Sequence, residues 1–216
     1  MKIFLDTADT EIIREYFATG LIDGVTTNPT LIMKSGRHSE DVYQELKELG
    51  IRDISMEVVG TESEMLSEGQ RLAEKFGDVC TVKVPCTREG LSVCKSLSDQ
   101  GIKVNVTLIF CSAQAVLASK AGATYISPFV GRVDDNSFSG LDLIKEISQL
   151  YREQMITTQV LSASLRDAHS VAKCFTYGSD IVTMPPAVFE KMYNHVLTDK
   201  GLEQFDKDWS QVNGVN

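Results

Sequence analysis

The sequence contains few of the features that mark nucleic-acid-binding, membrane or secreted proteins. Lysine and arginine together number 21 against 30 aspartates and glutamates, and this net charge of −9 includes no basic stripe for nucleic acid. No apolar run approaches the roughly 20 residues that span a bilayer. The N-terminus, MKIFLDTADTEII, carries acids where a signal peptide has its apolar segment. We therefore expect a cytoplasmic protein without nucleic-acid or membrane partners.

Metal and nucleotide motifs are also missing. The five cysteines form no C-x-x-C pair, and their odd number suits reduced thiols. His38, His169 and His195 are too far apart in the sequence to form a histidine metal motif on one helix. Neither a G-x-G-x-x-G turn nor a Walker A loop is present. The sequence predicts no histidine metal site and no glycine-rich nucleotide loop.

Short apolar runs alternate regularly with longer stretches of helical spacing. Helix caps are expected at Asp9 or Thr10 and at Thr61, and no Pro/Ser-rich linker divides the chain. We therefore expect one domain over residues 1–216. The runs that predict strands cover residues 2–5, 24–27, 54–59, 79–84, 102–109, 124–129, 158–164 and 180–184.

Eight strands that alternate with helices match the count of an α/β (β/α)₈ TIM barrel. An open doubly wound sheet alternates in the same way, but its first strand usually ends in a glycine-rich turn, and here the first strand ends in LDTAD. An additional C-terminal helix is expected at about 201–212, with Phe205, Trp209 and Val212 on one face. This helix could cover its own barrel or that of a neighbouring subunit.

The segment VCTVKVPCTREG, residues 79–90, contains a lysine in a β-branched run. Strand alternation puts Val82 and Val84 on one face and Thr81 and Lys83 on the other. If the valines pack against helices, Lys83 points into the space that the sheet encloses. On an edge strand, in contrast, the same lysine would simply face water.

Polar residues recur at the C-terminal ends of seven predicted strands, where the loops of a barrel build the active site. A closed barrel would bring them around one mouth. The eighth strand, which ends at Met184, contributes little. The polar strand ends are Asp6, Thr26-Thr27-Asn28, Glu57, Lys83, Asn105 with Thr107, Ser127, and Ser164 with Arg166.

A lysine in such a mouth suggests Schiff-base chemistry. At its ordinary pKa, about one lysine in 2,500 is neutral at pH 7, and desolvation raises that fraction. A neutral amine attacks a carbonyl, and the resulting iminium withdraws electrons for C–C cleavage. Asp6, Glu57 and Thr107 are available for the proton transfers.

Basic residues near the same mouth suggest a phosphorylated substrate. Arg132 and Arg166 could hold a phosphate together with a serine hydroxyl and backbone N–H groups. In a chain of net charge −9, two arginines at one end of the barrel suggest an anionic ligand.

With these residues identified, the whole chain resembles the short single-domain transaldolases and the closely allied fructose-6-phosphate aldolases. The resemblance lies in FLDTAD, DGVTTNPTLI, VKVPCTREGL, IKVNVTLIF, AGATYISPFVGRVDD, LSASLRD and LTDKGLEQFDKDW. It implies a (β/α)₈ barrel that transfers a dihydroxyacetone unit between sugar phosphates through a lysine Schiff base, with neither cofactor nor metal. It also implies the pentose phosphate pathway and a homo-oligomer, commonly a decamer of two pentamers.

The resemblance assigns a role to each candidate residue. Lys83 is the Schiff-base lysine, Asp6 transfers the proton at the C3–C4 bond, and Glu57 with Thr107 holds the catalytic water. The substrate-binding residues that it implies are Asn28, Asn105 and Ser127 for the dihydroxyacetone part, and Arg132, Ser164 and Arg166 for the phosphate.

Two positions bear on the choice between the sister activities. The fructose-6-phosphate aldolases have glutamine in place of Glu57 and tyrosine in place of Phe129, so this chain has the transaldolase pattern. A lyase that releases free dihydroxyacetone is the alternative, and a non-catalytic sugar-phosphate-binding barrel is a third. Asp167 departs from the pattern: it either faces the phosphate site, where it would weaken binding, or caps a helix.

Overall fold

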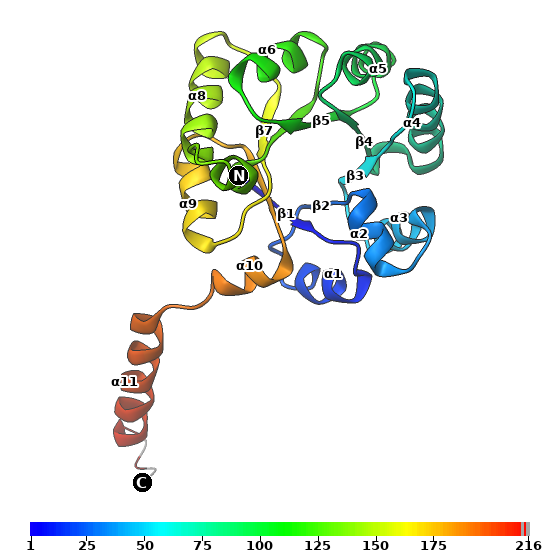
Figure 1. The fold of residues 1–216 in the computed structure, drawn as a ribbon. Helices are drawn as coiled ribbons and strands as arrows, with labels where there is room; N and C mark the ends of the chain where they lie inside the picture. Colours follow the sequence, from blue (N-terminus) through cyan, green and yellow to red (C-terminus); the bar gives the residue numbers. More distant parts are fainter. Residues whose placement is uncertain (213, 215–216) are drawn as a thin grey trace.

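Eight parallel strands close into a barrel with the strand order β1 to β8 (Figure 1). The structure is a computed structural model that describes residues 1–212 and 214, so positions 213, 215 and 216 of the expected domain lie outside the described residues. Each strand falls within or beside its predicted run, so the barrel prediction is confirmed. The strands are β1 (Lys2–Asp6), β2 (Gly24–Thr26), β3 (Ile54–Glu57), β4 (Cys80–Pro85), β5 (Val104–Ile109), β6 (Tyr125–Pro128), β7 (Gln159–Ser162) and β8 (Ile181–Met184).

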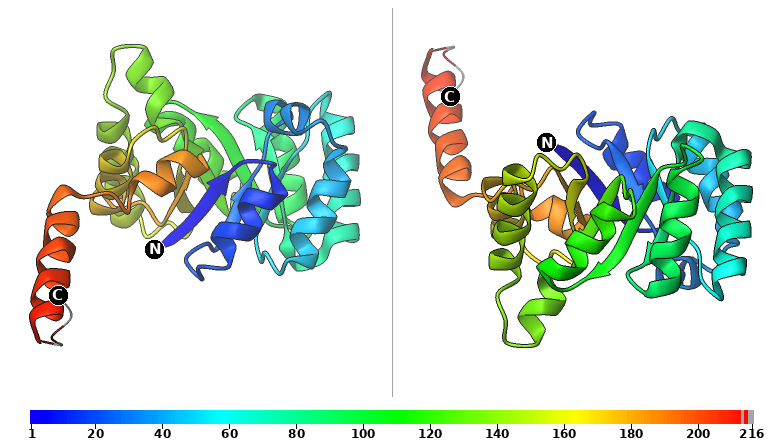
Figure 2. Two further views of the ribbon diagram at one scale, coloured as in Figure 1. Left: turned by 90° about the horizontal axis from the view of Figure 1, so that it is seen from below. Right: turned by 90° about the horizontal axis from the view of Figure 1, so that it is seen from above.

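Helices surround the barrel on its outer side (Figure 2). Two helices follow β2, β6 and β8, and a short 3₁₀ turn (Gly77–Val79) precedes β4. Their bounds are α1 (Thr10–Phe17), α2 (Pro29–Ser35), α3 (Ser39–Glu48), α4 (Glu62–Phe76), α5 (Arg88–Ser98), α6 (Ser112–Lys120), α7 (Val130–Asp135), α8 (Gly140–Glu153), α9 (Ala168–Thr176), α10 (Pro186–Lys191) and α11 (Val196–Val212).

Local side-chain caps begin several of these helices. Asp9 accepts hydrogen bonds from the backbone N–H groups of α1, and Thr61 forms a capping box with Glu64 at the start of α4. Thr87 caps α5 directly after β4 ends at Pro85. The caps predicted from the sequence at Asp9 and Thr61 are confirmed.

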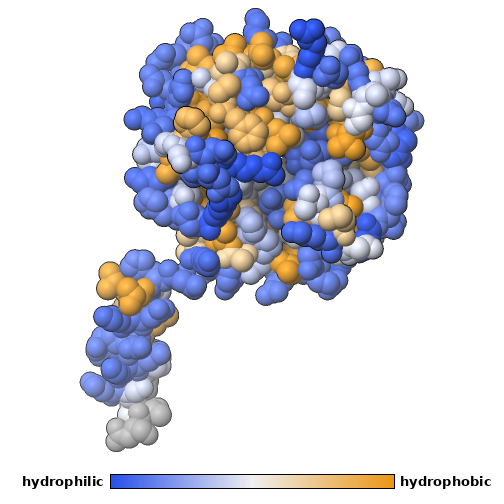
Figure 3. Space-filling model, viewed as in Figure 1, coloured by the Kyte–Doolittle hydropathy of each residue, from blue (hydrophilic) through white to orange (hydrophobic). Residues whose placement is uncertain are grey.

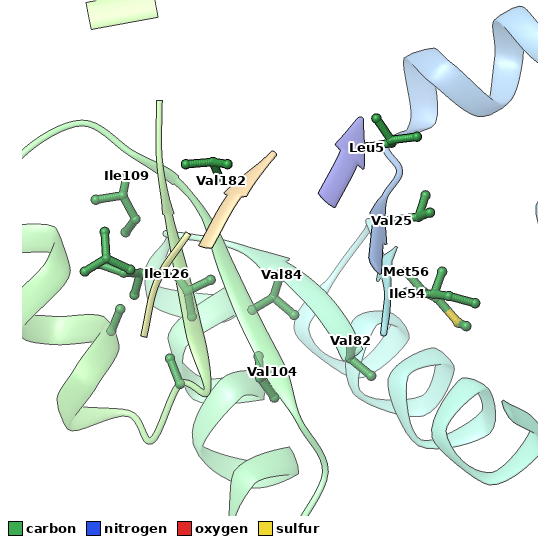
Figure 4. Close-up of a cluster of buried hydrophobic side chains, with 14 of the residues drawn as sticks. Leu5, Val25, Ile54, Met56, Val82, Val84, Val104, Ile109, Ile126 and Val182 are labelled. Carbon is green, nitrogen blue, oxygen red and sulfur yellow. The ribbon is translucent and has the colours of Figure 1, made fainter. Parts of the chain in front are cut away.

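The hydrophobic core lies between the barrel and the helices. Alternating strand residues such as Val82, Val84 and Val104 point outward into this layer, and all three are fully buried (Figure 4). The residues between them therefore point into the barrel. On β4 these inward residues are Thr81 and Lys83.

The N-terminal end of the barrel is closed by a polar cluster around Asp53. Its Oδ1 accepts a hydrogen bond of 2.8 Å from Thr81, and its Oδ2 accepts one of 2.7 Å from Tyr125. Lys103 Nζ lies 3.3 Å from the same Oδ2. Because hydroxyl and ammonium donors meet both carboxylate oxygens, this buried charge is well satisfied.

The C-terminal helix α11 projects away from the barrel (Figures 1 and 2). It begins at Val196, earlier than the sequence predicted, and ends at Val212. None of its residues is buried, and Leu202 and Phe205 are 56% and 69% exposed. In the space-filling view, hydrophobic atoms lie on the surface of this helix (Figure 3). Within residues 1–212 and 214, no helix is long and apolar enough to cross a membrane.

Candidate active site

A cavity of about 100 Å³ lies at the C-terminal ends of the strands, where parallel strands direct their loops. Its lining combines a lysine, a carboxylate, an arginine and several hydroxyls. The lining residues are Asp6, Thr26, Asn28, Lys83, Thr107, Ser127, Phe129, Arg132, Ala163, Ser164 and Thr183. Eight of the eleven residues predicted from the sequence therefore share this cavity, and Glu57, Asn105 and Arg166 lie outside its lining.

A larger groove of about 780 Å³ lies beside this cavity, lined by α6, α7, α8 and the residues next to them. Arg132 lines both spaces, and Phe110 of the groove packs edge-on against Phe129 of the cavity at 5.8 Å between ring centres. The groove contains neither Lys83 nor Asp6. We place the candidate active site in the smaller cavity because the chemically competent groups converge there.

Lys83 lies in the barrel interior and is only 5% exposed. The strand register pairs Lys83 with Glu57 on β3 and with Asn105 on β5. Lys83 Nζ lies 2.9 Å from Glu57 Oε2 and donates a hydrogen bond of 2.7 Å to the Thr27 carbonyl oxygen. A buried lysine is costly unless it is paired, and these two acceptors are its partners. Glu57 is thus in position to take a proton from the amine.

Asp6 ends β1 and reaches into the same cavity. Burial raises the pKa of the Asp6 carboxyl above its usual value, against the opposing effects of the Lys83 ammonium, the Thr26 hydroxyl and Arg132. Thr26 donates a hydrogen bond of 2.7 Å to Asp6 Oδ1. A carboxyl with a raised pKa beside a lysine is well suited to take up and return a proton.

Polar residues of β5 and β6 complete the floor of the site. Asn105 donates to Ser55 Oγ at 3.2 Å and accepts from Ser127 Oγ at 2.8 Å, so its amide is held from both sides. Thr107 Oγ1 is buried and has no hydrogen-bond partner among the described protein atoms. An unpaired buried hydroxyl costs free energy, and it is therefore a group that a ligand can satisfy.

Asn28 serves a structural role as well as lining the cavity. Its Oδ1 accepts a hydrogen bond of 2.9 Å from Leu31 N–H and caps α2, and Pro29 occupies the first turn of that helix. The side chain is therefore held in one orientation at the mouth.

The three predicted phosphate ligands come from two neighbouring loops. Arg132 lies on α7, while Ser164 and Arg166 follow β7, and the backbone N–H of Gly131 donates a 3.1 Å hydrogen bond to the Ser164 carbonyl. Ser164 has a positive φ of 60°, which is unusual for a residue with a side chain. Arg132 and Ser164 line the cavity.

Arg166 instead forms a bidentate ion pair with Asp135, the last residue of α7. This pairing lowers the pKa of Asp135 and raises that of Arg166. A Cβ atom on Gly131 would lie 2.4 Å from the Ser164 carbonyl oxygen and 2.8 Å from Arg166 Nε, so glycine lets α7 pack closely against the loop that follows β7. The sequence did not reveal Asp135, because residues 135 and 166 meet only when the two loops pack together.

Asp167 caps a helix, as one of the two interpretations of the sequence held. Its Oδ1 accepts a hydrogen bond of 2.8 Å from Ser170 N–H at the start of α9. The backbone and side-chain hydrogen bonds of Ser170 lower the pKa of Asp167. Its carboxylate is thus engaged in α9.

Thr183 corrects the prediction that the eighth strand contributes little. It lies on β8, is 2% exposed, and lines the cavity. Its Oγ1 lies 2.7 Å from Thr26 Oγ1. The strand ends at Met184, whereas alternation puts Thr183, and not Met184, in the interior. Within residues 1–212 and 214, no group of three or more His, Cys, Asp and Glu residues could hold a metal ion.

The chain is similar to known proteins over nearly its whole length. Residues 3–215 match the family model described as "Transaldolase/Fructose-6-phosphate aldolase". The chain is 53% identical over 213 residues to a "Probable transaldolase" of Caulobacter vibrioides, with 98% of each chain covered. It is 51% identical over 213 residues to one of Paracoccus denitrificans, again with 98% of each covered. It is 52% identical over 209 residues to one of Hyphomonas neptunium, with 96% of each covered.

Proposed function

The chain belongs to the transaldolase/fructose-6-phosphate aldolase family, and from this premise we propose that it is a transaldolase. It would transfer a dihydroxyacetone unit from fructose 6-phosphate or sedoheptulose 7-phosphate to an aldose phosphate, as in the pentose phosphate pathway. The observation that carries the proposal is the buried Lys83, paired with Glu57 at 2.9 Å in a cavity that also contains Asp6.

In the proposed reaction, Lys83 Nζ gives a proton to Glu57 and attacks the C2 carbonyl of the donor. Loss of water from the carbinolamine forms the iminium. Glu57 and Thr107 hold the water that forms here and is used again in hydrolysis. The unpaired hydroxyl of Thr107 supports this role, since it has an open hydrogen-bonding position in the site.

Asp6 then takes the proton of the C4 hydroxyl, and the C3–C4 bond breaks. The electron pair of that bond moves to the iminium nitrogen, so an enamine remains on Lys83 and the aldehyde leaves. With an acceptor aldehyde in the site, the same steps run in reverse and Asp6 returns the proton. Asn28, Asn105 and Ser127 are the proposed ligands of the dihydroxyacetone hydroxyls.

The phosphate of the substrate is proposed to bind Arg132, Ser164 and Arg166. Guanidinium groups form paired hydrogen bonds with phosphate oxygens, and Arg132 and Ser164 already face the cavity. Arg166 retains its Nε–H, because its two terminal nitrogens contact Asp135.

Borohydride trapping followed by mass spectrometry tests the Schiff base. With fructose 6-phosphate present, the reduced adduct is expected on Lys83. The matched control is Lys103→Met, which removes the lysine paired with Asp53 at the other end of the barrel and is expected to trap normally. No adduct, or an adduct on another lysine, would overturn the mechanism.

The family also contains lyases, so the transferase reaction needs its own test. Glu57 and Phe129 are the residues of the transaldolase pattern. Phe129 favours transfer because a phenyl ring has no hydroxyl to direct water to the enamine. Fructose 6-phosphate is supplied with and without erythrose 4-phosphate. Rapid turnover without the acceptor would identify the chain as a fructose-6-phosphate aldolase, and binding without turnover would identify a non-catalytic barrel.

We further propose that the chain forms a homo-oligomer, a decamer of two pentamers by family resemblance. The exposed apolar side chains of Leu202 and Phe205 on α11 support association, because a helix without buried residues gains free energy by covering its apolar face. Light scattering is expected to show an assembly for the full chain and a smaller species for Leu202→Glu/Phe205→Glu. A monomeric full chain would reject this proposal without affecting the catalytic one.

A further inference from the structure

Three side chains form a continuous hydrogen-bonded chain across the point where the barrel closes. β1 pairs with β2 on one side and with β8 on the other. Thr26 of β2 donates to Asp6 Oδ1 of β1 at 2.7 Å, and Thr183 Oγ1 of β8 lies 2.7 Å from Thr26 Oγ1. Both threonines are only 2% exposed, and all three residues line the cavity.

The direction of the hydrogen bonds follows from counting hydrogens. A threonine hydroxyl carries one hydrogen, and an ionised carboxylate only accepts. Thr26 gives its hydrogen to Asp6, so the bond between the two threonines must use the hydrogen of Thr183. Chains of this kind polarise one another, and each donation strengthens the next. The donation that Asp6 receives therefore depends on a residue that Asp6 does not contact.

We propose that Thr183 is a positioning residue for Asp6 and acts through Thr26. The chain occupies Oδ1 and fixes the rotation of the carboxylate. Oδ2 then remains for the reacting hydroxyl of the substrate. The inference rests on the proposed function, because it assumes that Asp6 transfers the proton during C–C cleavage.

The charged groups around Asp6 determine which measurement is informative. Lys83 on β4 and Arg132 on α7 are the cations that act on this carboxyl, and both favour its ionised form. Glu57 is already paired with Lys83. Removing the Thr183 hydroxyl leaves these charges in place and weakens only the donation from Thr26. The pKa of Asp6 should then rise further, because a weaker hydrogen bond from Thr26 stabilises its ionised form less.

Thr183→Val tests the proposal, because valine keeps the shape of threonine and lacks its hydroxyl. We expect kcat to fall about 3- to 10-fold, as for the loss of one hydrogen bond, with KM nearly unchanged. The acid limb of the kcat profile should move to higher pH. Thr183→Ser keeps the hydroxyl, so its kcat and the acid limb of its pH profile should match those of the wild type. If Thr183→Val fails to fold, Thr183→Ala removes the same hydroxyl and is measured in the same way.

Thr81→Val is the matched control. Thr81 also donates to a buried carboxylate inside the barrel, but that carboxylate is Asp53 at the opposite end. It should lose stability and keep the wild-type pH profile. If Thr183→Val likewise loses only stability, or if its pH profile does not move, the chain merely closes the barrel and the proposal is wrong.

A measurement without substrate separates this inference from the proposed function. The titration of Asp6 is followed by carbon-13 NMR in the wild-type protein and in Thr183→Val. A higher Asp6 pKa in the variant supports the coupling even if the wild-type protein forms no adduct at Lys83. An unchanged pKa overturns the coupling even if the transaldolase reaction is demonstrated.

Discussion

The two ends of the barrel each contain a buried carboxylate and a lysine, yet the hydrogen bonding around them differs. At the N-terminal end, the two oxygens of Asp53 accept hydrogen bonds from Thr81 and Tyr125, and Asp53 forms an ion pair with Lys103. At the C-terminal end, Thr26 donates to Asp6 Oδ1 and is the one side-chain donor to Asp6 among the described residues. The Thr107 hydroxyl nearby has no partner among the described protein atoms.

This difference suggests that the N-terminal end stabilises the barrel and that the C-terminal end binds a ligand. A fully satisfied polar cluster holds the strands together and has no free group for a ligand. The C-terminal end instead retains an unpaired hydroxyl and a carboxyl whose pKa burial has raised. Such incomplete satisfaction costs stability and is expected where a substrate supplies the missing partners.

Replacing the lysine at each end by methionine gives the largest expected difference in turnover. Lys83→Met should reduce turnover by at least about 10³-fold, because Lys83 is the one lysine among the described residues that line the cavity. Lys103→Met should retain turnover and lower the free energy of unfolding by about 1–2 kcal/mol. Steady-state kinetics and urea unfolding of both variants check this, and normal turnover by a folded Lys83→Met variant would contradict the mechanism.

Phe129→Tyr sharpens the comparison by adding a hydroxyl at the incompletely satisfied end. The new group should order a water together with Glu57 and Thr107 near the enamine, so hydrolysis competes with transfer. We expect release of dihydroxyacetone without acceptor to rise by at least about 10-fold, since orienting a proton-transfer group is worth about 10²–10⁴-fold. The assay measures dihydroxyacetone from fructose 6-phosphate alone.

The matched control for that variant is Phe110→Tyr, which alters the ring that packs against Phe129 from the groove side. It should leave acceptor-free release unchanged. If a folded Phe129→Tyr variant shows no increase, the role assigned to Phe129 is wrong.

Asp53→Asn removes the central acceptor of the satisfied end. We expect the free energy of unfolding to fall by about 2–3 kcal/mol, because Thr81, Tyr125 and Lys103 lose a charged acceptor. Kinetic constants should not change, since the cluster lies at the opposite end of the barrel. Asp99→Asn, which breaks an exposed ion pair with Lys95, is the control and should change stability little. Loss of turnover in folded Asp53→Asn would show that the two ends are coupled.

Asp6→Asn gives the smallest expected effect on stability, and the size of that effect depends on pH. Burial raises the pKa of Asp6 in the folded chain above its ordinary value of 3.8. The folded state therefore binds this proton more tightly than the unfolded state, and wild-type stability from this group falls as pH rises through the folded pKa. Asp6→Asn should be more stable than wild type at pH 7.

That gain should shrink as the pH falls and disappear below the unfolded value, where Asp6 is protonated in both states. Urea unfolding at several pH values measures the difference. A variant less stable than wild type at pH 7 would show that the attraction to Lys83 and Arg132 outweighs the burial cost.

The sequence by itself determined the barrel and much of its site. Each of the eight runs overlaps one strand, because β-branched residues alternate there over short lengths bounded by turn residues. The caps at Asp9 and Thr61 were predictable because a cap involves only neighbours in the sequence. Alternation placed Lys83 on the face opposite Val82 and Val84, and the closed barrel made that face the interior.

Only the tertiary structure decided which distant polar groups are partners. Arg166 pairs with Asp135, and Thr183 reaches Thr26, because closing the barrel brings together loops or strands that are far apart in the sequence. Local patterns contain no information on such contacts. They depend on the strand register, on the close approach of Gly131 to the backbone of Ser164, and on the closure of β8 against β1. Local periodicity therefore determined which residues face the interior, and long-range packing decided which of them act together.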